Sequence, residues 1–322
     1  MGALHFTEDD YDEAERWFGE ALQSSRRAGG PDHYLTWDFT RWLGSVYILQ
    51  GRYAEAERAL MESFAQESRI FGERSWQAIW NVERLTHLYI LWNKPEQVRT
   101  WRAKLTGTAS GGSPEGSTRY DEAGDTYVIR GCGMDLWDIS DEFHFAHKTL
   151  YGDGSITARI DAVENTHLQT KAGIMIRKTR ETTSEHVSAF ITPSGAVTFQ
   201  RRIIEGGVGS RRQAKAGHVE LPHWIRLTRR GNAFSAQHSS DGINWEEITY
   251  GDPNHASPIE IPMDEAVYIG LVVTSHDVTK TAEARFSHVT TTGNVTPPGP
   301  FTESQDIRFQ LPASPDAAAG DK

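Results

Sequence analysis

The 322-residue sequence predicts two folds in succession, an array of paired α-helices (an α-solenoid) and an antiparallel β-sandwich. Two observations lead to this prediction. Residues 11–18 (YDEAERWF) recur 42 positions later as residues 53–60 (YAEAERAL), and residues 43–49 recur in the same way as residues 85–91. A repeat of this period indicates stacked supersecondary units. Beyond about residue 107 the repeat is lost, and short segments with alternating apolar residues follow, which indicates an all-β domain.

The helical half is predicted to span residues 1–106, and its motif is best preserved in residues 43–64. There the pattern L-G-x-x-Y leads into five further signature positions: Gly51, Tyr53, Ala56, Leu60 and Phe64. The pattern resembles the tetratricopeptide repeat, in which the small residue, here Ala56, lets two helices approach and Gly51 makes the turn between them. The 42-residue period is longer than the usual 34 and is similar to that of kinesin light chains.

The resemblance implies that the helices bind a protein or peptide in a groove. A helical spacer that only holds the β domain is an equally weighted alternative. Seven tryptophans are expected to form mostly inter-repeat core, with one or two on the inner face as candidate peptide anchors. They are Trp17, Trp37, Trp42, Trp76, Trp80, Trp92 and Trp101.

Residues 1–10 are too short to supply the helix that should pack against residues 11–25, and repeat arrays need capped ends. The alternative prediction is therefore a C-terminal regulatory fragment of a larger modular protein, such as a serine/threonine kinase with tetratricopeptide repeats. An in-frame kinase signature upstream of Met1 in the coding DNA would support it.

Residues 107–118 are rich in glycine and serine and are predicted to form a flexible linker. The sandwich is predicted to span residues 119–292, and residues 293–322 are predicted to be a disordered tail. Ten strands are expected within the sandwich, at residues 126–130, 143–149, 155–163, 172–177, 186–192, 196–203, 224–229, 233–239, 268–274 and 282–289.

Several strings of the β half occur in a distinctive order. They include residues 143–145 (FHF), 152–159 (GDGSITAR), 171–177 (KAGIMIR), 222–227 (PHWIRL) and 240–245 (SDGINW). This order resembles the domains similar to the regulation-of-enolase protein, which have the concanavalin A-like lectin and glucanase fold, a jelly roll. The resemblance implies the fold. It implies little about activity, because the function of that family is poorly defined.

Composition limits the partners. The net charge of -11 argues against nucleic acid and anionic membranes, because phosphate binding needs a concentrated basic face. The single cysteine, Cys132, excludes an internal disulfide and a multi-cysteine metal site. The sequence contains no signal peptide and no apolar run of the roughly 18 residues that span a membrane. The chain as written is predicted to be cytoplasmic, and its location is unknown if the N-terminus is truncated.

The sequence predicts no enzyme, no cofactor and no metal. A retaining glycosidase needs two carboxylates about 5 Å apart, and the E-x-D-x-x-E string of glucanases with this fold is absent. No HExxH or two-His-plus-carboxylate motif occurs either. Asp138 and Asp141 are candidate Ca²⁺ ligands, and the other interpretation is a turn capped by aspartates.

The remaining candidate is a polar row on one side of neighbouring strands. Alternation places Ala172, Ile174 and Ile176 in the core, with Val187, Ala189 and Ile191 beside them, and leaves the intervening residues facing outward. Polar planar groups beside an exposed aromatic ring suit a sugar or a peptide, and a solvated sheet face is the other interpretation. The predicted ligand-binding residues are Lys171, Arg177, His186, Phe190, Gln200 and Arg202. The sequence thus predicts a non-enzymatic interaction protein, with helical repeats that bind a protein or peptide and a lectin-like sandwich that binds carbohydrate or protein.

Overall fold

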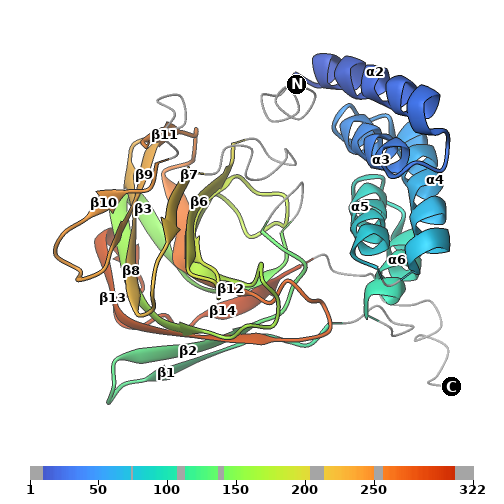
Figure 1. Cartoon of the computed structure of the whole chain (residues 1–322). Coiled ribbons are helices and arrows are strands. Elements are labelled where there is room, and N and C mark those ends of the chain that lie inside the picture. The colour runs from blue at the N-terminus through green and yellow to red at the C-terminus, as the bar shows by residue number, and fades with distance from the viewer. Residues whose placement is uncertain are drawn as a thin grey trace, which may run out of the picture. The chain divides into compact units, whose positions relative to one another are not determined.

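A computed structural model describes residues 10–73, 75–106, 113–136, 141–203, 214–249 and 257–308. The chain divides into two compact units (Figure 1). The first unit contains the helices, and the second, a set of antiparallel strands, spans Ser113–Arg308. The predicted succession of helical repeats and a β-sandwich is confirmed.

The helical unit contains α2 (Tyr11–Gly29), α3 (Tyr34–Leu49), α4 (Tyr53–Phe71), α5 (Trp76–Leu91) and α6 (Pro95–Thr106). Each helix packs against the next, and α3 also contacts α5. The starts of α2, α4 and α6 lie at residues 11, 53 and 95, and those of α3 and α5 at 34 and 76, so each interval is 42 residues (53 − 11, 95 − 53, 76 − 34). Among the described helices, none is long and apolar enough to cross a membrane.

Small residues determine how closely α3 and α4 pack. Gly44 lies against Leu60, where an added Cβ would stand 2.7 Å from Leu60 Cγ, and Ala56 is fully buried. Gly51 has a φ of +72°, a left-handed conformation that glycine adopts without strain, and makes the predicted turn between the helices. The repeat motif therefore specifies both the turn and the close approach.

A buried polar network joins α3, α4 and α5. Arg41 of α3 donates from Nη1 to Glu67 Oε1 of α4 at 2.8 Å, and Asn81 of α5 donates from Nδ2 to Glu67 Oε2 at 2.6 Å. Burial raises the pKa of the Glu67 carboxyl, and the charge of Arg41 opposes that rise. Glu67 therefore connects three helices through its two oxygens.

The second unit contains fourteen described strands, all with antiparallel pairings. They are β1 (Ser117–Asp121), β2 (Thr126–Gly131), β3 (Phe143–Val163), β4 (Lys171–Arg177), β5 (His186–Ile191), β6 (Ala196–Arg202), β7 (Ala214–His218), β8 (His223–Arg230), β9 (Ala233–Ser239), β10 (Glu246–Glu247), β11 (Ile259–Glu260), β12 (Ala266–Thr274), β13 (Ala282–Thr296) and β14 (Ser304–Ile307).

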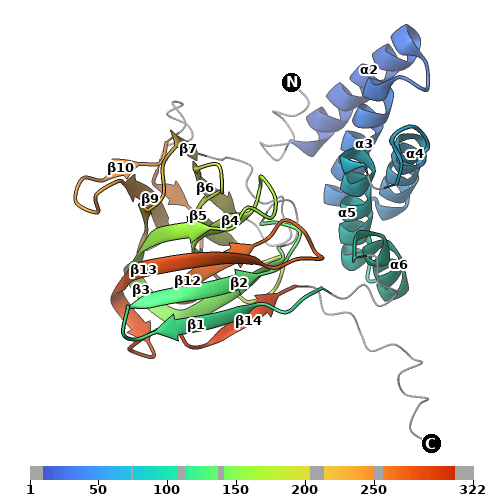
Figure 2. The same ribbon diagram turned by 60° about the horizontal axis from the view of Figure 1, so that its bottom comes forward.

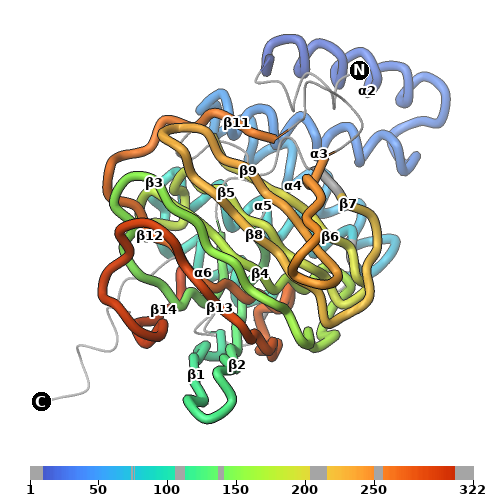
Figure 3. The backbone as a smooth tube through the Cα atoms, turned by 90° about the vertical axis from the view of Figure 1, so that its left-hand side faces the viewer, coloured from blue at the N-terminus to red at the C-terminus, as the bar shows by residue number. Residues whose placement is uncertain are grey.

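The strand β3 belongs to both layers of the sandwich. Residues 144–151 pair with β12, which leads through β4, β5 and β6 to β7, whereas residues 154–160 pair with β8, which leads to β9. Figure 2 shows β1, β2 and β13 side by side, and Figure 3 looks onto the layer of β8 and β9. The core between the layers contains all six inward residues that alternation predicts: Ala172, Ile174, Ile176, Val187, Ala189 and Ile191.

Two strands predicted at residues 143–149 and 155–163 are in fact one. The break between them is only a local irregularity, where Gly152 has a φ of +70° and the register with β13 shifts. The strand continues because its neighbour β13 pairs with it on both sides of this point.

The predicted end of the sandwich at residue 292 is too early. β13 continues to Thr296, β14 follows, and the ring of Phe301 is buried beside Tyr127, whose hydroxyl accepts the Phe301 N–H at 3.0 Å. Residues 293–308 are therefore part of the sandwich, and β1 likewise takes in residues 117–118 of the predicted linker. The rest of the predicted tail, from residue 309, and the linker residues 107–112 lie outside the described residues.

We predict that Glu67→Ala lowers the free energy of unfolding of the helical unit by about 3 kcal/mol, because it leaves the buried Arg41 and Asn81 without this partner. Urea unfolding of the full chain followed by circular dichroism at the helical wavelength measures the loss. Glu62→Ala on the same helix is the matched control, since its exposed ion pair with Arg26 contributes at most about 1 kcal/mol. Equal effects of the two changes would contradict the structural role of Glu67.

Candidate functional site

The six predicted ligand-binding residues lie together on the outer side of the layer formed by β4, β5 and β6. The backbone register sets Arg177, His186 and Arg202 in one row across three strands. Met175, Ser188 and Gln200 form the next row. We call this surface the arginine face and define it by Lys171, Arg177, His186, Ser188, Phe190, Gln200 and Arg202.

The arginine face is closed to solvent, so the expectation of an exposed row is wrong. None of the six predicted residues is more than 2% exposed, and the Phe190 ring is 1% exposed. The physical reason is a second apolar cluster on this side of the layer, in which Leu136 and β14 pack against Met175 and the start of β3. The residues around Asp135 and Asp141, which precede β3, supply partners to the face.

Asp141 holds two arginines of the face. Arg202 binds it through two hydrogen bonds, from Nη1 to Oδ2 at 2.6 Å and from Nη2 to Oδ1 at 2.7 Å, and Arg177 donates from Nη1 to Oδ2 at 3.5 Å. Burial alone would raise the pKa of Asp141, but the positive charges around it, chiefly that of Arg202, hold it below its usual value. This role of Asp141 was not predicted, because Asp141 lies 36 and 61 positions before Arg177 and Arg202 and only the fold brings the three residues together.

The alternative of a Ca²⁺ site at Asp138 and Asp141 is not supported. Both oxygens of Asp141 accept hydrogen bonds from Arg202, and a cation cannot share that position with two guanidinium groups. Asp138 lies outside the described residues. Within the described ranges, no three His, Cys, Asp or Glu side chains come close enough together to hold a metal ion.

A second ion-paired cluster lies at the other end of β4. The Lys171 ammonium donates to the Asp135 carboxylate, and His276 Nδ1 lies 3.4 Å from Asp135 Oδ2. Burial acts to raise the pKa of Asp135, but Lys171 and His276 together bring it below its ordinary value. Lys171 Nζ also lies 5.4 Å from the centre of the Phe190 ring. Each end of the arginine face therefore contains a charged pair.

Beside and between these clusters, three polar side chains are buried without hydrogen-bond partners in the described part of the chain, although His186 Nε2 lies 3.7 Å from Asp141 Oδ1. They are His186, through both ring nitrogens, Ser188 through its hydroxyl, and Gln200 through both amide atoms. Burial is the main cause that lowers the pKa of His186 to about 3, so its ring is neutral at pH 7. The charge of Asp141 acts to raise this pKa, and the charges of Arg202 and Arg177 act to lower it. An unsatisfied buried polar group costs about 1–3 kcal/mol. The middle of the face is therefore polar and unsatisfied while its ends are paired.

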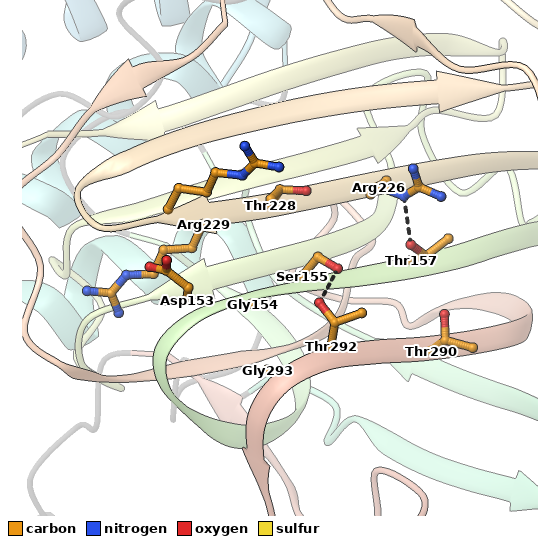
Figure 4. Close-up of a pocket in the computed structure, with 11 residues that line it drawn as sticks. Asp153, Gly154, Ser155, Thr157, Arg226, Thr228, Arg229, Thr290, Thr292 and Gly293 are labelled. Atoms are coloured by element: carbon orange, nitrogen blue, oxygen red, sulfur yellow. Dashed lines mark hydrogen bonds between the residues drawn. The ribbon is translucent and has the colours of Figure 1, made fainter.

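A second candidate is an open hollow of about 540 Å³ on the outer side of the other layer, which we call the Arg226 hollow. Figure 4 shows Ser155 and Thr157 of β3, Arg226 of β8 and Thr292 of β13 on neighbouring strands. No site was predicted at these residues from the sequence. The alternating hydroxyl and arginine residues of β8 (HWIRLTRR) are the signal that could have found it.

A tight loop at residues 241–245 positions the Trp245 ring next to this hollow. The Asp241 carboxylate accepts the backbone N–H groups of Ile243 and Asn244, both at 2.8 Å, and these bonds hold the pKa of Asp241 well below its usual range. The indole of Trp245 donates to the Gly242 carbonyl at 3.2 Å. The loop thereby directs Trp245 towards Arg226, whose guanidinium carbon lies 3.7 Å from the ring centre.

The comparisons with known proteins are limited to parts of the chain. Residues 1–65 match the family model of the tetratricopeptide repeat. This match confirms a tetratricopeptide-like N-terminal region. No curated protein matches the chain.

Solved structures resemble parts of the chain at low identity. A functionally unknown protein from Saccharomyces cerevisiae is 18% identical, with 57% of this chain and 93% of that chain covered and a TM-score of 0.43. The carbohydrate binding module CBM66 from Bacillus subtilis is 12% identical, with 56% and 94% covered and a TM-score of 0.33. BtubC from P. vanneervenii is 18% identical, with 29% and 37% covered and a TM-score of 0.28.

We predict that Asp141→Ala destabilises the sandwich by about 3–5 kcal/mol, because two buried guanidinium groups lose their carboxylate. Hydrogen exchange of peptides from β4 to β6 in the full chain measures this loss. Glu260→Ala, at an exposed position of β11, is the control and should change protection little. If Asp141→Ala does not fold, Asp141→Asn, which keeps the shape of the side chain, is expected to show a smaller loss of the same sign.

The neutral His186 predicts a pH dependence. Its folded pKa lies below its unfolded value of 6.5, so the unfolded chain takes up a proton that the folded chain excludes as the pH falls below 6.5. Stability should therefore decrease between pH 6.5 and pH 5 with a slope of up to about 1.4 kcal/mol per unit from this group.

The measurement is the urea midpoint of the full chain between pH 7 and pH 5. We expect His186→Gln to flatten the decrease, whereas His218→Gln, at an exposed position of the same unit, should leave it as it is. Identical pH profiles for the wild type and His186→Gln would show that His186 is not the group concerned.

Proposed function

We propose that this protein is a non-enzymatic, two-part interaction protein, with helices that bind a protein segment and a sandwich that binds a carbohydrate at the arginine face. The observation that carries the proposal is the set of buried polar atoms on Ser188, Gln200 and His186 that form no hydrogen bond with any described residue. The likeness of the 42-residue spacing to kinesin light chains, and of the β half to the regulation-of-enolase family, supports the two-part reading.

The chemistry of the unpartnered atoms suits a sugar. A sugar hydroxyl both donates and accepts hydrogen bonds. The Gln200 amide and the Ser188 hydroxyl can also do both, and the neutral imidazole of His186 has one donor and one acceptor nitrogen. Hydrogen bonds made in a layer without water are stronger than those made at a surface. A bound sugar would therefore satisfy several groups that are costly to leave unpaired.

The closed state of the arginine face affects the rate of binding. A ligand can reach Ser188 and Gln200, each at most 1% exposed, only when the layer opens. Association that requires a conformational change is slower than association with a preformed site. We therefore expect slow association with the sugar, in contrast to an open lectin surface.

The two carboxylates that pair with the arginine face, those of Asp135 and Asp141, support binding without hydrolysis. The general acid of a glycosidase has a raised pKa, whereas the pKa values of Asp135 and Asp141 are lowered by their cationic neighbours. Each carboxylate is therefore ionised and engaged, and neither is suited to donate a proton. Cleavage of a polysaccharide by the purified chain would contradict this part of the proposal.

On the helices, the candidate docking position is around Trp80 of α5, whose side chain is 41% exposed. Guanidinium carbons of Arg41 and Arg84 lie 4.8 and 5.8 Å from its ring centre. Tryptophan and arginine are the residues most often found where binding energy concentrates. This arrangement favours a docking role for the helices over that of a spacer.

The helical part of the proposal can be tested with peptides selected on the full chain from a random library. We expect Trp80→Ala to weaken the selected peptides at least about tenfold, as loss of a hot-spot residue does. Ile70→Ala, which truncates an apolar residue of α4 that is 45% exposed, is the matched control. Failure to select any peptide, or equal losses for the two variants, would favour the spacer.

Ser188→Ala separates ligand binding from structure. We predict that it raises the free energy of unfolding by about 1 kcal/mol, because it removes a buried hydroxyl without a partner, and that it weakens binding of the sugar at least about tenfold. A glycan panel on the full chain identifies the ligand, and titration calorimetry compares the variants.

Ser287→Ala is the matched control for this experiment. Ser287 of β13 also has a buried hydroxyl with no hydrogen-bond partner among the described residues, but it lies outside the arginine face. It should gain stability and keep its affinity for the sugar. Unchanged affinity in Ser188→Ala would remove the sugar from the arginine face, and binding to no glycan in the panel would reject the carbohydrate proposal.

A further inference from the structure

The Arg226 hollow contains a cation that is held in place and forms no ion pair within the described ranges. The Arg226 guanidinium stacks on the Trp245 ring at 3.7 Å, and its Nε donates to Thr157 Oγ1 at 3.2 Å. These contacts fix the plane of the guanidinium. Its two terminal amino groups bond to no residue in the described part of the chain, and Arg226 forms no ion pair there.

The surroundings of Arg226 are polar and open. Thr228 and Arg230 follow it on the same face of β8, and Arg230 is exposed. Ser155 Oγ and Thr292 Oγ1 bond to each other at 2.8 Å on the neighbouring strands (Figure 4). Alternate residues of a strand point to the same side, so Arg226 and Arg230 are about 13 Å apart along β8. Arg226 and Arg230 therefore lie on the same side of β8, beside the hydroxyl groups of the neighbouring strands.

A second hollow of about 410 Å³ continues this surface across β9 and shares Arg226, Thr228 and Arg230 with the first. Among the residues that the structure describes, one acidic residue borders each hollow, and each accepts a hydrogen bond from a neutral donor. Asp153 Oδ1 accepts the Gly231 N–H at 2.7 Å, and Glu247 Oε1 accepts Gln237 Nε2 at 2.8 Å. The row on β8 thus lies between two open hollows, and these two carboxylates bond to neutral donors and not to Arg226 or Arg230.

We propose that this surface binds an acidic polysaccharide, with one carboxylate or sulfate group held by the two terminal amino groups of Arg226 and a further one near Arg230. A guanidinium with two parallel free donors matches the two oxygens of such a group. The hydroxyl-lined floor suits the neutral parts of a sugar chain. The net charge of -11 opposes a long nucleic acid, which needs many cations instead of two.

This site is independent of the arginine face, since it uses different strands and different chemistry. The test measures binding of the full chain to four polymers: a heparin-type sulfated chain, polygalacturonate, neutral dextran and duplex DNA. We expect saturable binding to at least one of the two acidic polysaccharides, weakened by added salt. The sulfated and carboxylated chains distinguish the two possible sources of the oxyanion.

The variants assign the binding to Arg226. Arg226→Gln should reduce affinity at least about tenfold, as expected for a lost bidentate contact, and Arg226→Lys should fall in between, because lysine keeps the charge without the planar fork. Arg119→Gln, at an exposed arginine of β1, is the matched control and should leave affinity unchanged.

Three results would overturn the proposal. They are the absence of binding to both acidic polysaccharides, unchanged binding in Arg226→Gln, and binding of DNA that is as tight and as dependent on Arg226 as that of the polysaccharides. Binding of dextran equal to that of the acidic chains would likewise exclude an oxyanion as the recognised group.

Discussion

The backbone pairing of β3 is the constraint on which the sandwich depends. Its first half pairs with β12 and β14, its second half pairs with β8, and β13 pairs with parts of both halves, so the register of β3 fixes both layers at once. Both candidate sites follow from this. Phe143 and Phe145 pack in the apolar cluster on the side of the arginine face, and Thr157 binds Arg226 in the hollow. One strand thereby positions side chains on two opposite surfaces.

The two sites handle charge in opposite ways. On the arginine face, which excludes water, Arg202 and Arg177 share the Asp141 carboxylate, because a buried cation without a partner would be very costly. At the hollow, solvent hydrates the Arg226 guanidinium, and the Trp245 ring and the Thr157 hydroxyl fix its plane. On the buried arginine face, the charged side chains pair with each other, and neutral polar groups are left without hydrogen bonds among the described residues. In the open hollow, the described residues leave the charge of Arg226 without an ion pair.

Much of the fold could be predicted from sequence, because its signals are local. The 42-residue repeat predicted the helices, and the alternation in residues 172–176 placed Ile174 in the core and gathered the arginine-face residues on one side. Burial of that side could not be predicted, because its cover includes Leu136 and the short strand β14, which show no alternation. The hollow was missed because Arg226 and Thr157 are 69 positions apart, and only strand register brings them together.

The two ends of the sandwich unit lie next to each other. Arg308, its last residue, donates to the carbonyl of Ser113, its first, at 3.1 Å, and the Asp306 carboxylate accepts the Gly116 N–H at 3.1 Å. A unit whose two ends are adjacent can be inserted into a surface loop of another protein, because the two host residues that flank the insertion stay close together. The same closeness makes a circular permutant feasible, with a short peptide joining the ends and new termini opened at an exposed turn such as Gly231–Asn232.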